Sequence, residues 1–262
     1  QRHADDPAFG RRIGDLADLA FVGRNGRGVD GDAALLADRR RGGKAERGIP
    51  APLYSVAQAL ASLKLLRPVC YGQPEKTAEN VSVVFRDAGH ILGSASLEVT
   101  VQGEGKPRRL VFSGDLGMSN RPVLCDPAPP PTEADVLLIE PTYGDRLHRS
   151  LPETEDEIVA AFERTRAAKG NLIIPAFAVG RTQEIIYMLA DLVRRKRLSP
   201  LKVYVDSPMA NAATRITLAN QHLLDAETCE LIAWLKAHPK QMSLELVADV
   251  ERSIQLNDIR SG

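Results

Sequence analysis

Three short polar stretches decide how this sequence is interpreted: DAGHILGSA (87–95), SGDLG (113–117) and EPTYGDRLHR (140–149). Each of them follows a run of apolar residues that is typical of a β-strand. Together they place one histidine, one aspartate and one glutamate where a strand is expected to end. A metal site or an acid–base site on a sheet is usually assembled from such residues, so these stretches are the candidate site.

The runs around these stretches predict a β-rich first half. VSVVF (81–85) leads into the first stretch, and SLEVTV (96–101) alternates apolar and polar residues. We expect this second run to form an antiparallel hairpin with RLVFSGD (109–115). VLLIE (136–140) is predicted to be a fully apolar strand that ends in a glutamate at the rim of a buried sheet.

After residue 148 the pattern changes to alternating strands and helices. A helix is expected from Glu153 to Ala168, and caps at Asp225 and Asp249 predict two later helices. The expected strands are NLIIPAF (171–177), which we predict to be buried, KVYVDSP (202–208) and LELVADV (244–250). Strand–helix–strand connections of this length predict a parallel βαβ unit.

Composition limits the class of protein. The 262 residues are 44% hydrophobic and 26% charged, as in ordinary soluble domains. Thirty-four basic residues balance 34 acidic ones, so any nucleic-acid surface has to be a local patch. The three cysteines show no C-x-x-C spacing, which favours a reducing cytoplasm. We expect no signal peptide and no membrane span, and the missing initial methionine suggests a fragment or a processed chain.

Domain organisation is predicted in three parts. Residues 1–48 hold nine of the 20 glycines and many arginines and aspartates, which is typical of a disordered or loosely attached arm. An Arg-rich arm that touches RNA is the alternative. The apolar patterning of residues 49–150 and of residues 151–262 is typical of two globular domains. The first of these begins with a helix that Ser55 caps and that extends through Leu66.

Each candidate residue also has an ordinary structural explanation. His90 is a good zinc ligand type, yet a single histidine is more often a surface or hydrogen-bonded core residue. Asp115 could bridge metal ions, or it could be a turn aspartate that bonds its own backbone. Glu140 at a buried rim could have a raised pKa or orient a histidine, with a buried salt bridge as the alternative.

Two further groups of polar residues are candidates for binding substrate. The loop after Glu140 is rich in donors and acceptors, among them Thr142, Tyr143 and His148. Gly180, Arg181 and Thr182 lie between a strand and a helix, where free backbone N–H groups can hold a phosphate. This stretch has neither Walker-A spacing nor a G-x-G-x-x-G pattern, and an ordinary N-cap provided by Thr182 is the alternative.

The order of the motifs is more specific than any one of them. The three stretches above, followed by IIPAFAVGRTQEIIYML (173–189) and VYVDSPMA (203–210), resemble the β-CASP branch of the metallo-β-lactamase fold. The match is to bacterial relatives of the nuclease subunit of the cleavage and polyadenylation specificity factor. It covers about residues 50–262. It implies a mixed α/β fold: part of a metallo-β-lactamase αββα sandwich, then part of a β-CASP domain.

The resemblance also implies roles for the candidate residues. His90 resembles a metal ligand, and Asp115 resembles the carboxylate that bridges two zinc ions. Glu140 resembles the acidic residue that pairs with a later histidine near the leaving group. In such enzymes two zinc ions assist hydrolysis of an RNA phosphodiester bond, and the β-CASP part helps to form the RNA cleft.

The departures from the family pattern predict an incomplete site. The chain has five histidines, His3, His90, His148, His222 and His238, and none of them forms the H-x-H-x-D-H motif. The later histidine motifs are expected after SIQLNDIR (253–260), where the sequence stops. Because catalytic zinc sites use three protein ligands per ion, we expect this chain neither to retain zinc nor to cleave RNA alone. A shifted reading frame is one explanation for residues 1–48.

The sequence therefore predicts a metal-dependent hydrolase of the β-CASP type that acts on RNA in the cytoplasm, without a membrane partner. A homodimer of the complete protein is left open. Two alternatives remain at this stage: a non-catalytic RNA-binding or scaffold paralogue, and a small-molecule metallo-hydrolase of the same fold. We also expect an unpaired sheet edge and exposed apolar surface, and hence self-association in isolation.

Overall fold

The computed structural model describes residues 54–131, 133–142, 144–146 and 149–259. The chain divides into two compact units, residues 1–70 and 71–262, which are described separately. The predicted arm, residues 1–48, lies outside the described residues. The predicted boundary near residue 150 falls within the second unit and stays a prediction.

The described part of the first unit contains one helix, α3 (Val56–Leu63). The Ser55 hydroxyl accepts a hydrogen bond from the backbone N–H of Gln58 at 3.2 Å, and the Gln58 side chain accepts one from the Ser55 N–H at 2.8 Å. This reciprocal cap confirms the predicted start. The predicted extension to Leu66 is wrong, because the chain tightens into three-residue turns after Leu63 and approaches Pro68, which disfavours helical backbone before it.

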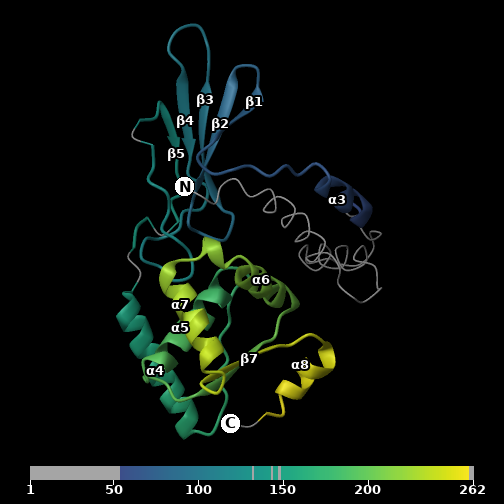
Figure 1. Cartoon of the computed structure of the whole chain (residues 1–262), viewed down its shortest axis with the longest axis vertical. Helices are drawn as coiled ribbons and strands as arrows, with labels where there is room; N and C mark the ends of the chain where they lie inside the picture. Colours follow the sequence, from purple (N-terminus) through teal and green to yellow (C-terminus); the bar gives the residue numbers. More distant parts are fainter. Residues whose placement is uncertain (1–53, 132, 143, 147–148, 260–262) are drawn as a thin grey trace, which may run out of the picture. The chain divides into compact units, whose positions relative to one another are not determined.

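The second unit contains a five-stranded sheet whose strands lie in chain order (Figure 1). The strands are β1 (Pro74–Ala78), β2 (Val81–Asp87), β3 (Ala95–Val101), β4 (Arg108–Phe112) and β5 (Val136–Leu138). The first four are antiparallel to their neighbours, and β5 runs parallel to β4. The predicted hairpin of β3 and β4 is confirmed. Strand β1 was not predicted, because PEKTA has no apolar alternation and forms a strand only by pairing with β2.

A buried carboxylate lies in the middle of this sheet. Glu98 on β3 is 8% exposed. Its Oε2 accepts hydrogen bonds from Arg86 on β2 at 2.6 and 3.0 Å, and its Oε1 lies 3.2 Å from Nε of Arg109 on β4. A buried charge is tolerated when it is paired in this way. The three central strands are therefore joined by side-chain ion pairs as well as by their backbones.

Helices dominate the rest of the second unit, with a two-stranded sheet among them. In chain order these elements are α4 (Leu151–Ala167), α5 (Arg181–Arg194), β6 (Leu201–Val205), α6 (Pro208–Ala219), the 3₁₀ helix η1 (Gln221–Leu223), α7 (Ala226–Ala237), β7 (Met242–Leu246) and α8 (Val250–Leu256). Strands β6 and β7 are parallel, so a βαβ unit is present. The mixed α/β fold is thus confirmed. In the described residues no helix has the length and apolar character needed to cross a membrane.

The prediction of a buried strand at 171–177 is wrong. These residues form no strand, and the side chains of Ile173 and Phe177 are 87% and 84% exposed. In the described structure β6 pairs with β7 and not with this segment. Pro175 in its middle also lacks the N–H that a ladder needs. The parallel unit is therefore formed by β6 and β7, and not by residues 171–177 with β6.

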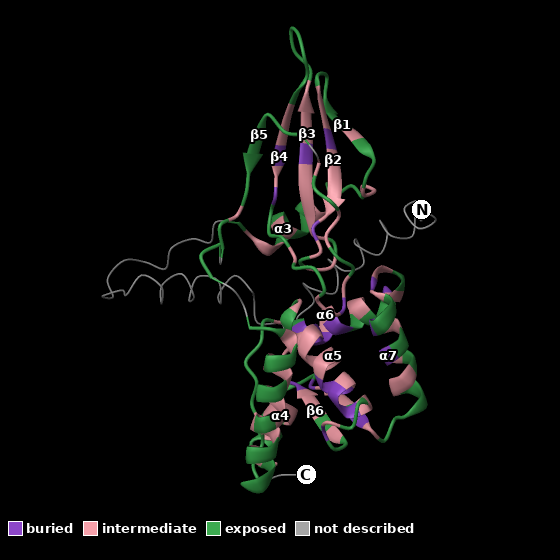
Figure 2. Ribbon diagram, turned by 90° about the vertical axis from the view of Figure 1, so that its left-hand side faces the viewer, coloured by how far each residue is buried: buried purple, intermediate pink, exposed green. Residues whose placement is uncertain are grey.

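The main hydrophobic core lies among α5, α7 and β7 (Figure 2). Leu192 on α5 and Leu231 on α7 are the largest fully buried side chains, and Met242 on β7 joins them. Helix α4 contributes partly buried apolar residues, including Phe162. Helices α5 and α7 thus pack through their apolar faces in this core.

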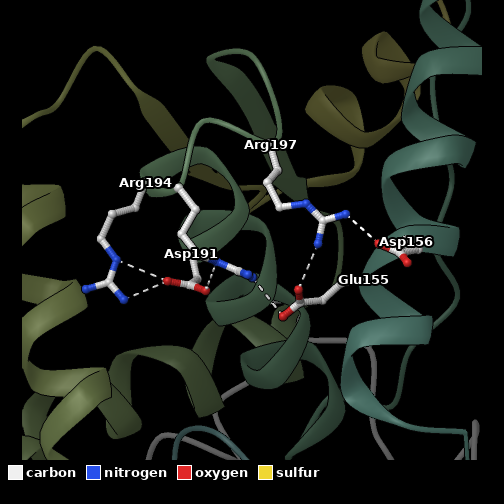
Figure 3. A network of polar contacts seen from close by, with 6 residues as sticks. Glu155, Asp156, Asp191, Arg194 and Arg197 are labelled. Carbon is white, nitrogen blue, oxygen red and sulfur yellow. Dashed lines mark hydrogen bonds and ion pairs between the residues drawn. The ribbon is translucent and has the colours of Figure 1, made fainter.

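An ion-pair network joins α4 to the end of α5 (Figure 3). The Glu155 carboxylate on α4 lies 2.7 Å from Arg195 and 3.1 Å from Arg197. Arg195 also pairs with Asp191 at 2.7 Å, and Arg197 pairs with Asp156 at 2.6 Å. Both arginines therefore bridge two carboxylates, which adds a specific electrostatic contact to the apolar packing of α4.

Strand β5 is exposed along its whole length (Figure 2). Val136, Leu137, Leu138 and the following Ile139 are between 46% and 61% exposed. The prediction that this apolar run belongs to a buried sheet is wrong. It pairs with β4 on one side as the last strand in the sheet order, which leaves its apolar side chains accessible.

Candidate functional site

The three predicted polar stretches meet at one edge of the five-stranded sheet. Strand β2 is antiparallel to β3, and β3 is antiparallel to β4, so β2 and β4 run in the same direction. Strand β5 is parallel to β4. Because the ends of co-directional strands lie at the same edge, the residues after Asp87, Phe112 and Leu138 are brought together. Sequence alone gave the strand ends but not their directions.

His90 and Asp115 face each other at this edge. The His90 Nε2 lies 4.0 Å from Oδ2 of Asp115, and the two side chains are 44% and 75% exposed. The His90 loop is fixed by local hydrogen bonds: the Ser94 hydroxyl accepts from the N–H groups of His90 and Ile91 at 3.1 and 3.2 Å. The Asp87 carboxylate accepts from the Gly89 N–H at 2.8 Å. A rigid loop thus presents an accessible imidazole to an accessible carboxylate.

Glycines hold these two loops together. The Gly117 N–H donates to the Ala88 carbonyl oxygen at 2.8 Å. A Cβ at Gly117 would overlap the carbonyl oxygen of Gly89, so the two backbones approach more closely than any other residue would permit. Gly89 itself has φ +62°, and a Cβ there would lie 2.8 Å from the backbone nitrogen of Pro127. The glycines in both sequence stretches therefore set the separation of His90 and Asp115.

Glu140 supports the Asp115 loop. Its Oε1 accepts a hydrogen bond from the Leu116 N–H at 2.8 Å, and its own N–H donates to the Ser113 hydroxyl at 3.0 Å. The Leu116 N–H, together with the Thr142 hydroxyl, lowers the pKa of the Glu140 carboxyl, and the nearby His90 adds to this effect. The expectations of a raised pKa and of a buried salt bridge are wrong, because the carboxylate is only partly buried and the hydrogen bond from the Leu116 N–H stabilises its charged form.

Helix α5 begins beside the His90 loop. Its N-cap, Gly180, has φ +80°, and a Cβ there would lie 3.2 Å from Cγ2 of Ile91. Ile91 is the immediate neighbour of His90. The second candidate region, Gly180 to Thr182, is therefore adjacent to the first, which the sequence did not indicate.

The backbone N–H groups expected to be free at this helix start are already used. Gly180 donates to Oε1 of Gln183 at 2.8 Å, Arg181 to the Val179 carbonyl at 3.1 Å, and Thr182 to the Phe177 carbonyl at 3.2 Å. The expectation of a backbone cradle is wrong, and so is the alternative of Thr182 as N-cap. The hydroxyl of Thr182 also bonds the Phe177 carbonyl, at 2.8 Å.

The remaining candidates are only partly described. Thr142 is hydrogen-bonded to Glu140, as noted above. Tyr143 and His148 lie outside the described residues. The guanidinium of Arg181 is half exposed and lies 2.6 Å from the Glu184 carboxylate. Arg181 is thus a half-exposed cation at this helix start that is already paired with Glu184.

The donors at the sheet edge fit part of a zinc site. Two ligands of one tetrahedral zinc ion, with bonds of about 2.1 Å, lie about 3.4 Å apart. The 4.0 Å between His90 and Asp115 is close to that separation. The described residues contain no group of three histidine, cysteine or carboxylate side chains that could hold an ion. His90 and Asp115 are thus two neighbouring side chains of types that bind zinc.

Comparison with known proteins points to one family. Residues 182–262 match the Beta-Casp domain. These residues are part of a β-CASP domain, and the chain resembles the β-CASP family. It is 44% identical to Ribonuclease TTHA0252 of Thermus thermophilus over 159 residues, which are 61% of this chain and 35% of that protein. It is 32% identical to an RNase J-like protein of Methanocaldococcus jannaschii over 144 residues, 54% of this chain and 33% of that one.

A eukaryotic relative extends the comparison. Cleavage and polyadenylation specificity factor subunit 3 of Dictyostelium discoideum is 30% identical over 160 residues, which cover 60% of this chain and 20% of the relative. The chain therefore spans about a third or less of the length of these curated relatives. The family resemblance predicted from the motif order is confirmed.

Proposed function

We propose that this chain is part of a metal-dependent β-CASP hydrolase that cleaves RNA phosphodiester bonds. The observation that carries the proposal is the convergence of His90, Asp115 and Glu140 from three separate strand ends. The relatives named ribonuclease and cleavage factor support RNA as the substrate. A sheet edge with an imidazole and two carboxylates suits hydrolysis of a phosphodiester.

The residues have different roles in this proposal. His90 and Asp115 would hold zinc, which when bound supplies an activated nucleophile and stabilises charge on the phosphate. Glu140 is ionised at neutral pH, because its lowered pKa favours the carboxylate. It therefore accepts hydrogen bonds from the Asp115 loop and from any imidazolium placed beside it. A charged carboxylate in this position would accept a proton and not donate one.

The 262 residues do not provide a complete site in this proposal. They contain no H-x-H-x-D-H motif, and two donors do not make the three-ligand set of a catalytic zinc ion. We therefore expect the chain by itself to bind zinc weakly and to leave RNA intact. A cytoplasmic location and a homodimer of the complete protein stay predictions.

Metal analysis tests the site. The purified chain is loaded with zinc, dialysed and measured by elemental analysis, beside the variants His90→Ala and Asp115→Ala. We expect substoichiometric zinc that either variant lowers further. One zinc or more per chain after dialysis would overturn the claim of an incomplete site. Equal zinc in the chain and both variants would overturn the assignment of these two residues.

RNA binding tests the substrate class. Labelled single-stranded RNA is titrated with the chain, with Arg181→Ala, and with Arg164→Ala as the matched control on the exposed side of α4. We expect Arg181→Ala to weaken binding several-fold and Arg164→Ala to change it little, since Arg181 follows Gly180, which lies against Ile91 of the His90 loop. Equal losses in both variants would contradict a local site. Binding without any cleavage in a zinc-loaded complete protein would favour the scaffold alternative.

A further inference from the structure

Two of the three cysteines are brought to one junction by the tertiary structure. Cys125 and Cys229 are separated by more than 100 positions in the sequence. An antiparallel bridge between Leu124 and Leu224 joins the segment before Cys125 to the segment before α7. None of the three cysteines is in a disulfide. The bridge therefore places Cys125 beside the start of the helix that carries Cys229.

Two more hydrogen bonds fix this junction. The Asp225 N–H donates to the Val123 carbonyl at 3.3 Å. The Val123 N–H donates to the Thr228 hydroxyl at 3.1 Å, and both of these residues are buried. Cys125 follows Val123 by two positions, and Cys229 follows Thr228 by one. The two cysteines thus flank a contact that is held by side chain and backbone together.

The thiols differ in their access to solvent. Cys125 is exposed, whereas Cys229 is partly buried and its Sγ–H donates to the Gln221 carbonyl at 3.3 Å. Partial burial of the sulfur, and then the charges of Asp225, Asp87 and Asp126, raise the pKa of the Cys125 thiol, and Cys229 adds a smaller effect. The Cys125 thiol is therefore accessible but mostly protonated, so only its small thiolate fraction reacts and oxidation is expected to be slow, and Cys229 is close enough to add to the shift.

We propose that Cys125 and Cys229 are an oxidation site that closes to an intramolecular disulfide. The oxidant is a hydroperoxide. The Cys125 thiolate attacks one peroxide oxygen of hydrogen peroxide, which breaks the O–O bond and gives a sulfenic acid and water. The Cys229 thiolate then attacks that sulfur and displaces the hydroxyl as a second water. Two thiols and one peroxide thus give one disulfide and two waters, and the cysteines lose the two electrons that the peroxide gains.

The disulfide would restrain the segment from Cys125 to Ala128, which supports the His90 loop of the candidate site. The segment that carries Cys125 continues to Ala128, whose N–H donates to the Asp87 carbonyl at 2.9 Å at the start of the His90 loop. Pro127 in the same segment contacts Gly89. A bond to α7 would tie this support to the helical part of the unit. This inference does not depend on the proposed function.

Peptide mapping tests the proposal on the unaltered chain. The chain is treated with hydrogen peroxide while folded and, separately, in concentrated urea, and disulfide-linked peptides are quantified by mass spectrometry. In the unfolded chain the Cys70–Cys125 pair closes the shorter loop and is entropically favoured. We expect the folded chain to give the Cys125–Cys229 pair instead, and reduction by dithiothreitol to restore both thiols.

Variants and labelling complete the test. In folded Cys70→Ser, hydrogen peroxide should oxidise the two remaining thiols together. In folded Cys125→Ser, Cys229 should form no intramolecular disulfide. A mixture of isotopically heavy and light chain should give linked peptides of one label only. The proposal is overturned by linked peptides of mixed label. It is also overturned by sulfinic acid at Cys125 without the disulfide, or by the same distribution of pairs in the folded and unfolded chain.

Discussion

Loss of one charge in the network between α4 and α5 should measurably loosen the helical part of the second unit. Glu155→Gln keeps the size of the side chain and removes the charge that Arg195 and Arg197 share, at 2.7 and 3.1 Å. The glutamate side chain is 20% exposed, and the two arginines are 40% and 32% exposed. Water therefore screens both contacts partly, and the network is neither fully buried nor fully solvated.

The magnitude follows from these exposures. An exposed ion pair contributes about 0.2–1 kcal/mol, and two partly screened pairs that share one carboxylate should contribute about 1 kcal/mol together. For a unit of this size that corresponds to a fall in melting temperature of about 2–4 °C. Thermal unfolding followed by circular dichroism measures it. The effect should shrink in about 1 M NaCl, where the screening length falls to about 3 Å.

A control on the same helix separates charge from helix propensity. Glu163→Gln makes the same chemical change at an exposed position of α4, and it should alter stability by less than about 0.5 kcal/mol. If both variants lower the melting temperature equally, the network does not stabilise the packing of α4. An effect of Glu155→Gln that persists unchanged in high salt would also refute the electrostatic explanation.

Three further perturbations follow from the described contacts. Gly117→Ala should lower the free energy of unfolding in urea by about 1–3 kcal/mol, because the added Cβ overlaps the backbone oxygen of Gly89. The control Gly103→Ala should leave it unchanged, because a Cβ there meets nothing within 4 Å. Hydrogen bonds, the largest from Arg252, lower the pKa of Glu245 to about 2. The stability that this carboxylate contributes is present above its ordinary pKa of 4.5 and is lost as pH falls toward 2. Glu245→Gln should therefore flatten the pH dependence of the free energy of unfolding between these two pH values. An unchanged slope would contradict the assignment. Leu137→Lys on the exposed edge strand should reduce self-association in sedimentation experiments without changing the unfolding midpoint.

Local signals in the sequence were reliable where a structure depends on neighbours along the chain. The caps predicted at Ser55, Asp225 and Asp249 each accept a hydrogen bond from the N–H three residues later. Their geometry needs only one turn of chain, so the residue types suffice to predict it. The order of the motifs likewise predicted the resemblance to the β-CASP family, which the comparisons confirm.

Predictions of burial failed where they depended on distant partners. Residues 171–177 and the run ending at Ile139 are apolar enough to predict buried strands, yet both are exposed. A strand is buried only when another strand or layer packs on it, and sequence composition does not specify that partner. The raised pKa expected for Glu140 is wrong for the same reason. Its pKa is lowered chiefly by a hydrogen bond from the Leu116 N–H, which lies 24 positions away in the sequence.

The sequence by itself determined which side chains are available for chemistry: His90, Asp115 and Glu140, each after a strand. Only the tertiary structure decided that they meet, because the direction of three strands, and not their composition, brings those ends to one edge. It alone joined Cys125 to the helix of Cys229, through one bridge and two hydrogen bonds between distant segments. Contacts between residues far apart in the chain depend on global packing, which no local pattern encodes.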